Sequence, residues 1–152
     1  MSRFTVHHVL FDLVRSLNIP EKNVNAIQKA LIKSETRFLE LVNLLPLPVF
    51  ETDRNGEFTF ANKSAHEIFG YPESDLTAGK NIVEMVIPEE RGIVATHLDM
   101  CLNGKAIDIS EYTAQRENGS TFPIIIHSGL MSENDSIYGI RGAVVDITKS
   151  KE

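Results

Sequence analysis

Two different spacings of apolar residues divide this chain of 152 residues near Pro46-Leu47-Pro48. Before that segment, apolar residues recur every three or four positions, which is the period of an α-helix. After it, apolar and polar residues alternate over several stretches, which is the period of a β-strand. The pattern therefore predicts a helical N-terminal part followed by a domain that contains a sheet.

The helical part predicts two helices, over residues 5–17 and 20–45. Intervals of three and four residues separate the apolar positions of the second helix, with Ser34 as a polar interruption, and this is a heptad seam. It predicts a homodimer through a parallel two-stranded coiled coil, with docking of the helix on its own domain as the alternative. The candidate dimer positions are Val24, Ile27, Leu31, Phe38, Leu41 and Leu45.

The part after Pro48 begins with a hairpin that leads into a short helix. Asn55-Gly56 tolerates the positive φ angles of a tight turn. Asn62 is a candidate N-cap for the helix, and Gly70 is a candidate stop. The apolar residues around the turn are expected to share one buried side: Val49, Phe58 and Phe60.

The remaining pattern predicts two brief turns, a helix over residues 88–102 and three strands over residues 107–117, 120–132 and 136–148. Asn118-Gly119 joins the first two of these strands and again signals a hairpin. This order of elements predicts an α+β fold in which a five-stranded antiparallel sheet carries helices on one face.

Composition excludes several classes of function. The net charge is −6, and the 15 basic residues form no run, so we expect no nucleic-acid partner. No apolar stretch has the length of a membrane span, and the N-terminus lacks the order of a secretory signal, so we expect a cytoplasmic protein without membrane contact. The single Cys101 forms no internal disulfide, suggests no metal site, and is expected to be a small buried helix residue.

Catalytic motifs are missing as well. The sequence has no Gly-rich phosphate loop, no H-E-x-x-H, no G-x-S-x-G and no carboxylate pair in a recognisable motif. We therefore expect no catalytic residues in this chain.

Three stretches together resemble a PAS domain, the small sensory module of bacterial and archaeal signalling proteins. They are "VFETDRNGEFTFANKSAHEIFGYPESDLTAGKNI", "RENGSTFPIIIHSG" and "GAVVDITKSKE", and the resemblance covers about residues 38–150. It implies a dimerisation or signal helix over residues 1–45, a PAS domain over residues 46–148 and, from residue 149, a linker to an output domain. In the family the D-I-T end leads to that output, which assigns the role to Asp146, Ile147 and Thr148.

The resemblance implies a cytoplasmic sensor that binds a small ligand or relays a conformational change to its output domain. A two-component histidine kinase is the expected parent protein. The alternative is a ligand-free module for dimerisation and protein interaction, with a packed core. Both interpretations stay open at this point.

Cofactors known in the family do not fit the sequence. Light-sensing flavin domains carry a reactive cysteine where "GKNIVEMV" has Ile82, and photoactive yellow protein links its chromophore to a cysteine after a proline where Pro88 is followed by Glu89. The haem ligand of oxygen sensors would lie nearer Val94 or Ala95 than His97, so His97 is expected to point away from the pocket in a surface or structural role. The ligand is therefore unknown.

Strand phase and family position give the candidate pocket residues. His127 alternates out of phase with them and is expected on the other side of the sheet. An apolar or aromatic ligand with one or two hydrogen-bonding groups would suit the set, which also fits a packed core without ligand. The candidates are Phe60, Ile82, Met85, Val86, Leu98, Ser110, Tyr112, Ile124, Ile126, Ser128, Gly142 and Val144.

Overall fold

The computed structural model describes residues 21–105 and 109–151, and the chain divides into two units between Leu44 and Leu45. The predicted helix over residues 5–17 lies outside the described residues. No helix in the described ranges is both long enough and apolar enough to cross a membrane.

In the first unit, helix α2 (Glu21–Leu44) occupies the range predicted for the second helix. Its candidate dimer positions differ in exposure: Val24 is buried, Leu31 is half-buried, and Ile27 and Leu41 expose 40% and 60% of their surface. Phe38 is exposed too, and Leu45 follows the helix in the second unit. Apolar exposure of this kind is compatible with a partner helix, and the coiled coil stays a prediction.

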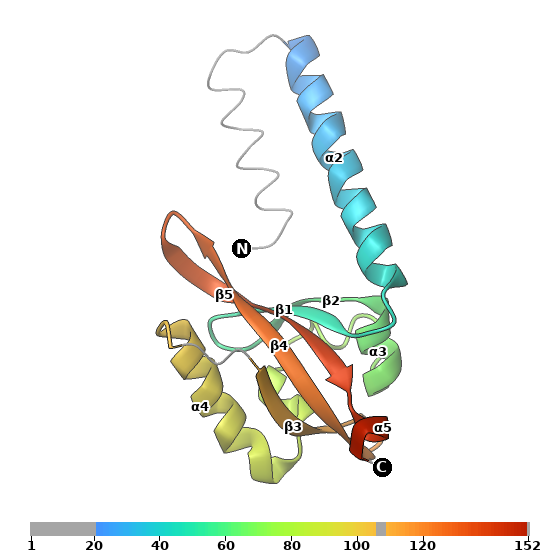
Figure 1. Cartoon of the computed structure of the whole chain (residues 1–152). Helices are drawn as coiled ribbons and strands as arrows, with labels where there is room; N and C mark the ends of the chain where they lie inside the picture. Colours follow the sequence, from blue (N-terminus) through green and yellow to red (C-terminus); the bar gives the residue numbers. More distant parts are fainter. Residues whose placement is uncertain (1–20, 106–108, 152) are drawn as a thin grey trace. The chain divides into compact units, whose positions relative to one another are not determined.

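The second unit is built on a five-stranded antiparallel sheet, as predicted (Figure 1). The strand order is β2-β1-β5-β4-β3, so β2 and β3 lie at the two edges and the first and last strands in the sequence, β1 and β5, pair inside the sheet. The strands are β1 (Val49–Asp53), β2 (Phe58–Ala61), β3 (Ile109–Gln115), β4 (Thr121–Glu133) and β5 (Ser136–Asp146).

Short helices pack on one face of this sheet, and together they form one hydrophobic core. Ala65 and Phe69 of α3, Met85 of η1 and Val94 of α4 lie in the same cluster as the inward residues of the strands. This arrangement confirms the predicted α+β fold. The helices are α3 (Lys63–Phe69), η1 (Ile82–Met85), η2 (Pro88–Glu90), α4 (Arg91–Leu102) and α5 (Thr148–Lys151).

The predicted caps of α3 are confirmed. The Asn62 side chain accepts a hydrogen bond from the Ala65 amide at 3.1 Å, and Gly70 ends the helix in the left-handed region at φ 80°. Asn62 is fully buried, and further hydrogen bonds satisfy its side chain there: Oδ1 also accepts from the Val49 amide at 2.9 Å, and Nδ2 donates to the Leu47 carbonyl at 3.1 Å. One amide side chain thus joins the start of β1 to the start of α3.

In the first hairpin, the buried side differs from the predicted one. Phe58 is buried, but Val49 and Phe60 are only half-buried, and Phe50 takes the inward position. The reason is a β-bulge: Phe60 pairs with Glu51 whereas Phe58 pairs with Thr52, so one extra residue of β2 places the two phenylalanines on opposite faces. Phe60 therefore shares the outer face with Glu51.

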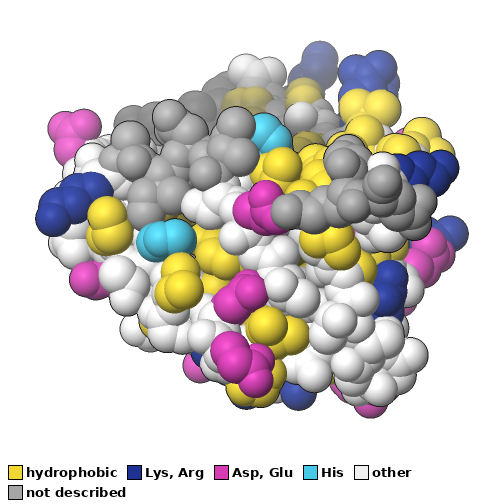
Figure 2. Space-filling view, turned by 60° about the horizontal axis from the view of Figure 1, so that its bottom comes forward, with side chains coloured by type: hydrophobic (Ala, Val, Ile, Leu, Met, Phe, Trp, Pro, Cys, Tyr) yellow, Lys and Arg dark blue, Asp and Glu magenta, His cyan; other side chains and the backbone are white. Residues whose placement is uncertain are grey.

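Figure 2 shows one face of the molecule, on which acidic, basic and apolar side chains are interspersed. The described basic side chains on this face do not gather in one patch.

Candidate functional site

Two cavities lie in the core of the second unit. The first, here called the polar-ended cavity, lies between α4 and the sheet and has a volume of about 40 Å³. The second, the apolar cavity, has a volume of about 30 Å³ and only apolar side chains in its described lining. Each is large enough for water-sized molecules, since one water needs a volume of about 10–15 Å³.

The two cavities are neighbours because they share part of their lining. Phe50, Ile82, Val94 and Ile126 contribute to both. These four side chains form the wall between the cavities, and they come from β1, η1, α4 and β4. A movement of this wall would join the two spaces.

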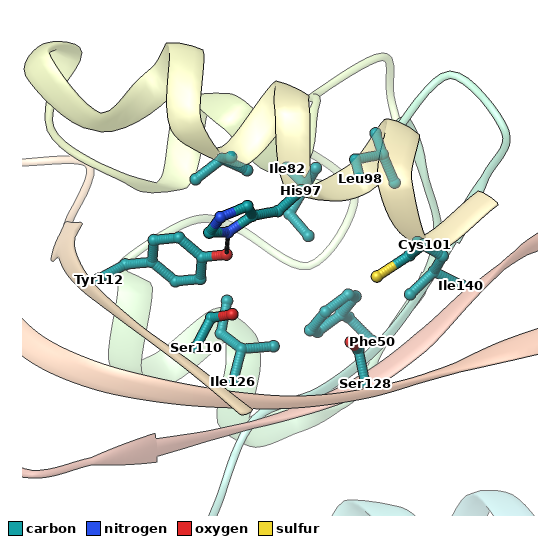
Figure 3. Close-up of a pocket in the computed structure, with 11 residues that line it drawn as sticks. Phe50, Ile82, His97, Leu98, Cys101, Ser110, Tyr112, Ile126, Ser128 and Ile140 are labelled. Carbon is teal, nitrogen blue, oxygen red and sulfur yellow. Dashed lines mark hydrogen bonds between the residues drawn. The ribbon is translucent and has the colours of Figure 1, made fainter. Parts of the chain in front are cut away.

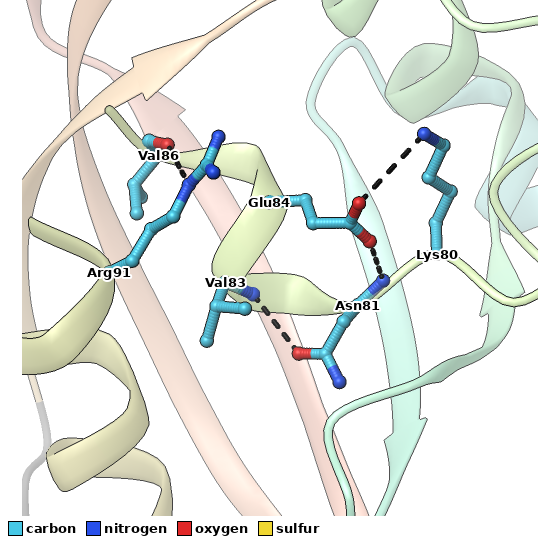
Figure 4. A network of polar contacts seen from close by, with 6 residues as sticks. All are labelled: Lys80, Asn81, Val83, Glu84, Val86 and Arg91. Carbon is cyan, nitrogen blue, oxygen red and sulfur yellow. Dashed lines mark hydrogen bonds and ion pairs between the residues drawn. The ribbon is translucent and has the colours of Figure 1, made fainter. Parts of the chain in front are cut away.

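A network of polar contacts surrounds η1, the element that carries Ile82 of the wall (Figure 4). Asn81 and Glu84 form a capping box at the start of η1, with the Asn81 amide donating to Glu84 Oε2 at 2.7 Å and the Val83 amide donating to Asn81 Oδ1 at 3.2 Å. The Ile82 amide donates to the Gly56 carbonyl at 2.8 Å. The Asn55-Gly56 turn of the first hairpin, with Gly56 at φ 85°, thus holds η1 and its wall residue in place.

At one end of the polar-ended cavity, an imidazole and a phenol face each other (Figure 3). His97 Nδ1 and the Tyr112 hydroxyl lie 2.5 Å apart in a hydrogen bond. Burial raises the pKa of the Tyr112 phenol, and a side-chain hydrogen bond with Ser110 offsets part of that rise, so the phenol is protonated at neutral pH. Ser128 adds a further hydroxyl to the lining.

This geometry corrects the expectations for His97 and Cys101. His97 points into the cavity, because Val94, His97, Leu98 and Cys101 follow one another at helical spacing on the face of α4 that meets the sheet. Cys101 is half-buried and lines the same cavity. Within the described ranges, no three His, Cys, Asp or Glu side chains lie close enough together to hold a metal ion.

The structure brings most of the predicted pocket residues to these cavities. Leu98, Ser110, Tyr112 and Ser128 line the polar-ended cavity. Met85, Val86, Ile124 and Val144 line the apolar one, and Ile82 and Ile126 line both. Whether these residues hold a ligand stays a prediction.

Two predicted pocket residues line neither cavity. Phe60 lies on the outer face because of the bulge in the first hairpin. Gly142 is paired with Phe50 across β1 and β5, and a Cβ atom on it would lie 2.5 Å from Phe50 Cζ. Gly142 thus provides the room for the Phe50 ring, and the ring, not the glycine, reaches the cavities.

Sequence reasoning missed lining residues of both cavities. Those of the polar-ended cavity are Phe50, Val94, His97, Cys101 and Ile140, and those of the apolar cavity alone are Pro48, Phe58, Ala61, Ala65, Phe69 and Leu76. The helical spacing of Val94, His97 and Cys101 is a signal that could have found three of them. Of the histidines outside the cavities, His127 is exposed, as its strand phase predicted.

The expected output end follows directly on β5. Asp146 ends the strand, Ile147 is buried, and Thr148 begins α5. Asp146 Oδ1 accepts hydrogen bonds from the Thr148 amide and hydroxyl, and the hydroxyl bond, followed by a smaller amide contribution, keeps the pKa of this exposed carboxyl below its usual value. The side chain of Asp146 thereby caps the turn that leaves the sheet.

Comparisons with known proteins agree with this architecture. The sequence profile described as PAS domain matches residues 46–149. None of the curated proteins matches the chain significantly.

Among solved structures, the PAS domain of an HTR-like protein from Haloarcula marismortui has a TM-score of 0.66 at 22% identity, covering 81% of this chain and 99% of that chain. A domain of a sensory box sensor histidine kinase/response regulator from Geobacter sulfurreducens has a TM-score of 0.63 at 19% identity, covering 76% and 96%. The RpfR quorum-sensing receptor PAS domain from Cronobacter turicensis, solved in complex with C12:0, has a TM-score of 0.59 at 16% identity, covering 68% and 96%. The profile match extends over most of the chain, and the chain therefore belongs to the PAS domain family.

Proposed function

We propose that this chain is a cytoplasmic sensor domain that binds a small ligand in its core cavities and passes the resulting change to an output domain, as part of a two-component histidine kinase. The PAS domain is a sensory module and not itself catalytic. A neighbour in fold comes from a sensor histidine kinase/response regulator, which supports the choice of parent protein. Another was solved in complex with C12:0, which supports a fold that accepts a small molecule.

One observation carries the proposal: both cavities border the strand that leads to the output end. Ile140 of β5 lines the polar-ended cavity and Val144 of the same strand lines the apolar one. The strand ends at Asp146, only two residues after Val144. An occupant that binds one arrangement of the wall better than another therefore acts on β5 directly, which is the requirement for a ligand to shift a conformational equilibrium.

The small size of the cavities favours a second candidate function, a ligand-free module for dimerisation and protein interaction. With about 40 Å³ and 30 Å³ of open space, the core is close to filled. The exposed apolar positions of α2, such as Ile27 and Leu41, would then be its functional surface through a homodimer. The two functions differ in what they predict for a substitution that fills the cavities.

The deciding experiment compares Ile126→Trp with Ile125→Trp. Ile126 lies in the wall between the cavities, whereas Ile125 is a half-buried neighbour on the same strand that lines neither. A sensor predicts that some member of a metabolite library raises the melting temperature of the native protein and of Ile125→Trp but not of Ile126→Trp, because a ligand stabilises only the state it binds.

The opposite result contradicts ligand sensing. If no compound raises the melting temperature of the native protein and Ile126→Trp is at least as stable as the native protein, the core simply tolerates filling. The interaction module would then be the better description.

A further inference from the structure

The combined size of the two cavities limits what they can hold, and this inference rests on the proposed function. The two cavities have volumes of about 40 Å³ and about 30 Å³. A cavity known to bind benzene has about 150 Å³, which is more than twice their combined volume. One six-membered ring is therefore the upper limit of size for an occupant, and it fits only after the wall between the cavities has moved.

The lining also limits the charge of an occupant. Neither cavity has a Lys, Arg, Asp or Glu among its described lining residues. A carboxylate would be buried without a fixed positive charge beside it, which costs several kcal/mol in a protein interior. A hydroxyl needs only one or two hydrogen bonds, and the His97–Tyr112 end with the Ser110 hydroxyl offers both donors and acceptors.

The remaining lining suits an aromatic ring. The Phe50 ring stands in the wall between the cavities, packed edge-on against Phe58 with ring centroids 5.8 Å apart. Aromatic pairs in such offset or edge-to-face arrangements contribute stabilisation in addition to that from their buried area. Ile82 and Ile126 complete an apolar slot beside it.

We propose that the two cavities join around a neutral single-ring phenol, whose ring replaces the empty space beside Phe50 and Ile126 and whose hydroxyl bonds to the His97–Tyr112 pair. Phe50 and Ile126 move apart to admit the ring. The site selects against the aromatic carboxylate of the same size because the described lining holds no Lys or Arg, and so no permanent positive charge, to pair with it.

The test uses three probes of one ring each: phenol, benzene and benzoate. Dissociation constants are measured by amide chemical-shift titration of the full chain. We compare the native protein with a double variant, His97→Leu with Tyr112→Phe, which removes both hydrogen-bonding partners together. Removing both keeps either from being left unpaired, so the fold is expected to survive. Tyr138→Phe is the matched control, because Tyr138 is half-buried and lines neither cavity.

We expect phenol to bind the native protein and benzoate to bind at least tenfold more weakly. The ratio of phenol affinity to benzene affinity should fall about tenfold in the double variant, because the phenol hydroxyl then loses its hydrogen bonds to His97 and Tyr112. The ratio should stay within twofold in Tyr138→Phe. Benzoate binding as tightly as phenol, or an unchanged ratio in the double variant, would overturn the inference.

Failure of this inference and failure of the proposed function give different results. If none of the three probes binds but another compound stabilises the native protein and not Ile126→Trp, the proposal of a phenol ligand is wrong and the proposed sensor function is supported. If nothing binds and Ile126→Trp retains full stability, both are wrong.

Discussion

The contact between Gly142 and Phe50 gives the most direct test of how the cavity wall is built. Gly142→Ala would add a Cβ atom 2.5 Å and 2.8 Å from two atoms of the Phe50 ring and 3.1 Å from the His127 carbonyl oxygen. Ordinary van der Waals contact needs about 3.5–4.0 Å, so the ring must shift by about 1 Å. The free space on the far side of the ring is the pair of cavities.

Two opposing effects determine how much Gly142→Ala changes the free energy of unfolding. Overpacking a core by one methyl group costs about 1–3 kcal/mol. Replacing glycine by alanine returns about 0.4–1 kcal/mol because the unfolded chain loses freedom. We expect a net loss of about 1–2 kcal/mol, which for a domain of about 100 residues lowers the melting temperature by about 4–15 °C.

The assay is urea denaturation of four proteins that form a double-mutant cycle: native, Gly142→Ala, Phe50→Leu and the combination. Leucine leaves room for the new methyl group, so the combination should be about 1 kcal/mol more stable than the sum of the two single changes. Gly129→Ala is the control, since nothing lies within 4 Å of its added Cβ atom, and it should stay within about 0.5 kcal/mol of native. Additive losses in the cycle would refute the contact as the cause.

Three further substitutions test other parts of the structure. Asn62→Ala should cost about 2–4 kcal/mol in urea denaturation, because it removes a helix cap and leaves buried backbone groups of β1 unpaired; a loss below about 1 kcal/mol would contradict this. Burial holds the pKa of Tyr112 above 10.0, so above that pH the folded state keeps a proton that the unfolded state loses, and this contribution to stability is lost as the pH rises from about 10 through the higher folded-state pKa. Tyr112→Phe should therefore gain stability relative to native as the pH rises above about 10, and parallel pH curves would count against the buried phenol. Ile27→Lys with Leu31→Glu should halve the mass in sedimentation equilibrium if α2 forms the dimer, and an unchanged mass would reject the coiled coil.

Features set by neighbouring residues could be predicted from the sequence. Asn55-Gly56 and Asn118-Gly119 mark hairpins because the glycines adopt φ 85° and 90°, which few other residues tolerate. Asn62 and Gly70 bound α3 because a side-chain acceptor and a left-handed residue satisfy its terminal backbone groups. Each of these signals depends on the chemistry of at most a few adjacent positions.

Features that depend on the pairing of residues distant in the sequence could not be predicted from the sequence. Phe58 and Phe60 have the same phase in the sequence, and only the pairing of β2 with β1 shows the bulge that separates them. The direction of His97 depends on its partner Tyr112, which belongs to β3, and the sequence does not determine the register of β3 against β4. The wall between the cavities is likewise built from four separate elements.

The wall residue Phe50 also explains how a change in the cavities would reach the end of the domain. Its ring lies against Gly142, which is two residues from Ile140 of one cavity and two from Val144 of the other. Because a ring at this distance cannot move toward β5, an occupant must either displace Phe50 away from the strand or push the strand itself. Four residues further on, Asp146 caps the turn at Thr148, so the second response reaches the expected output end through one continuous strand. A ligand that leaves hydrogen exchange at Thr148 unchanged would therefore act by displacing Phe50 alone, and the signal would have to leave the domain by another route.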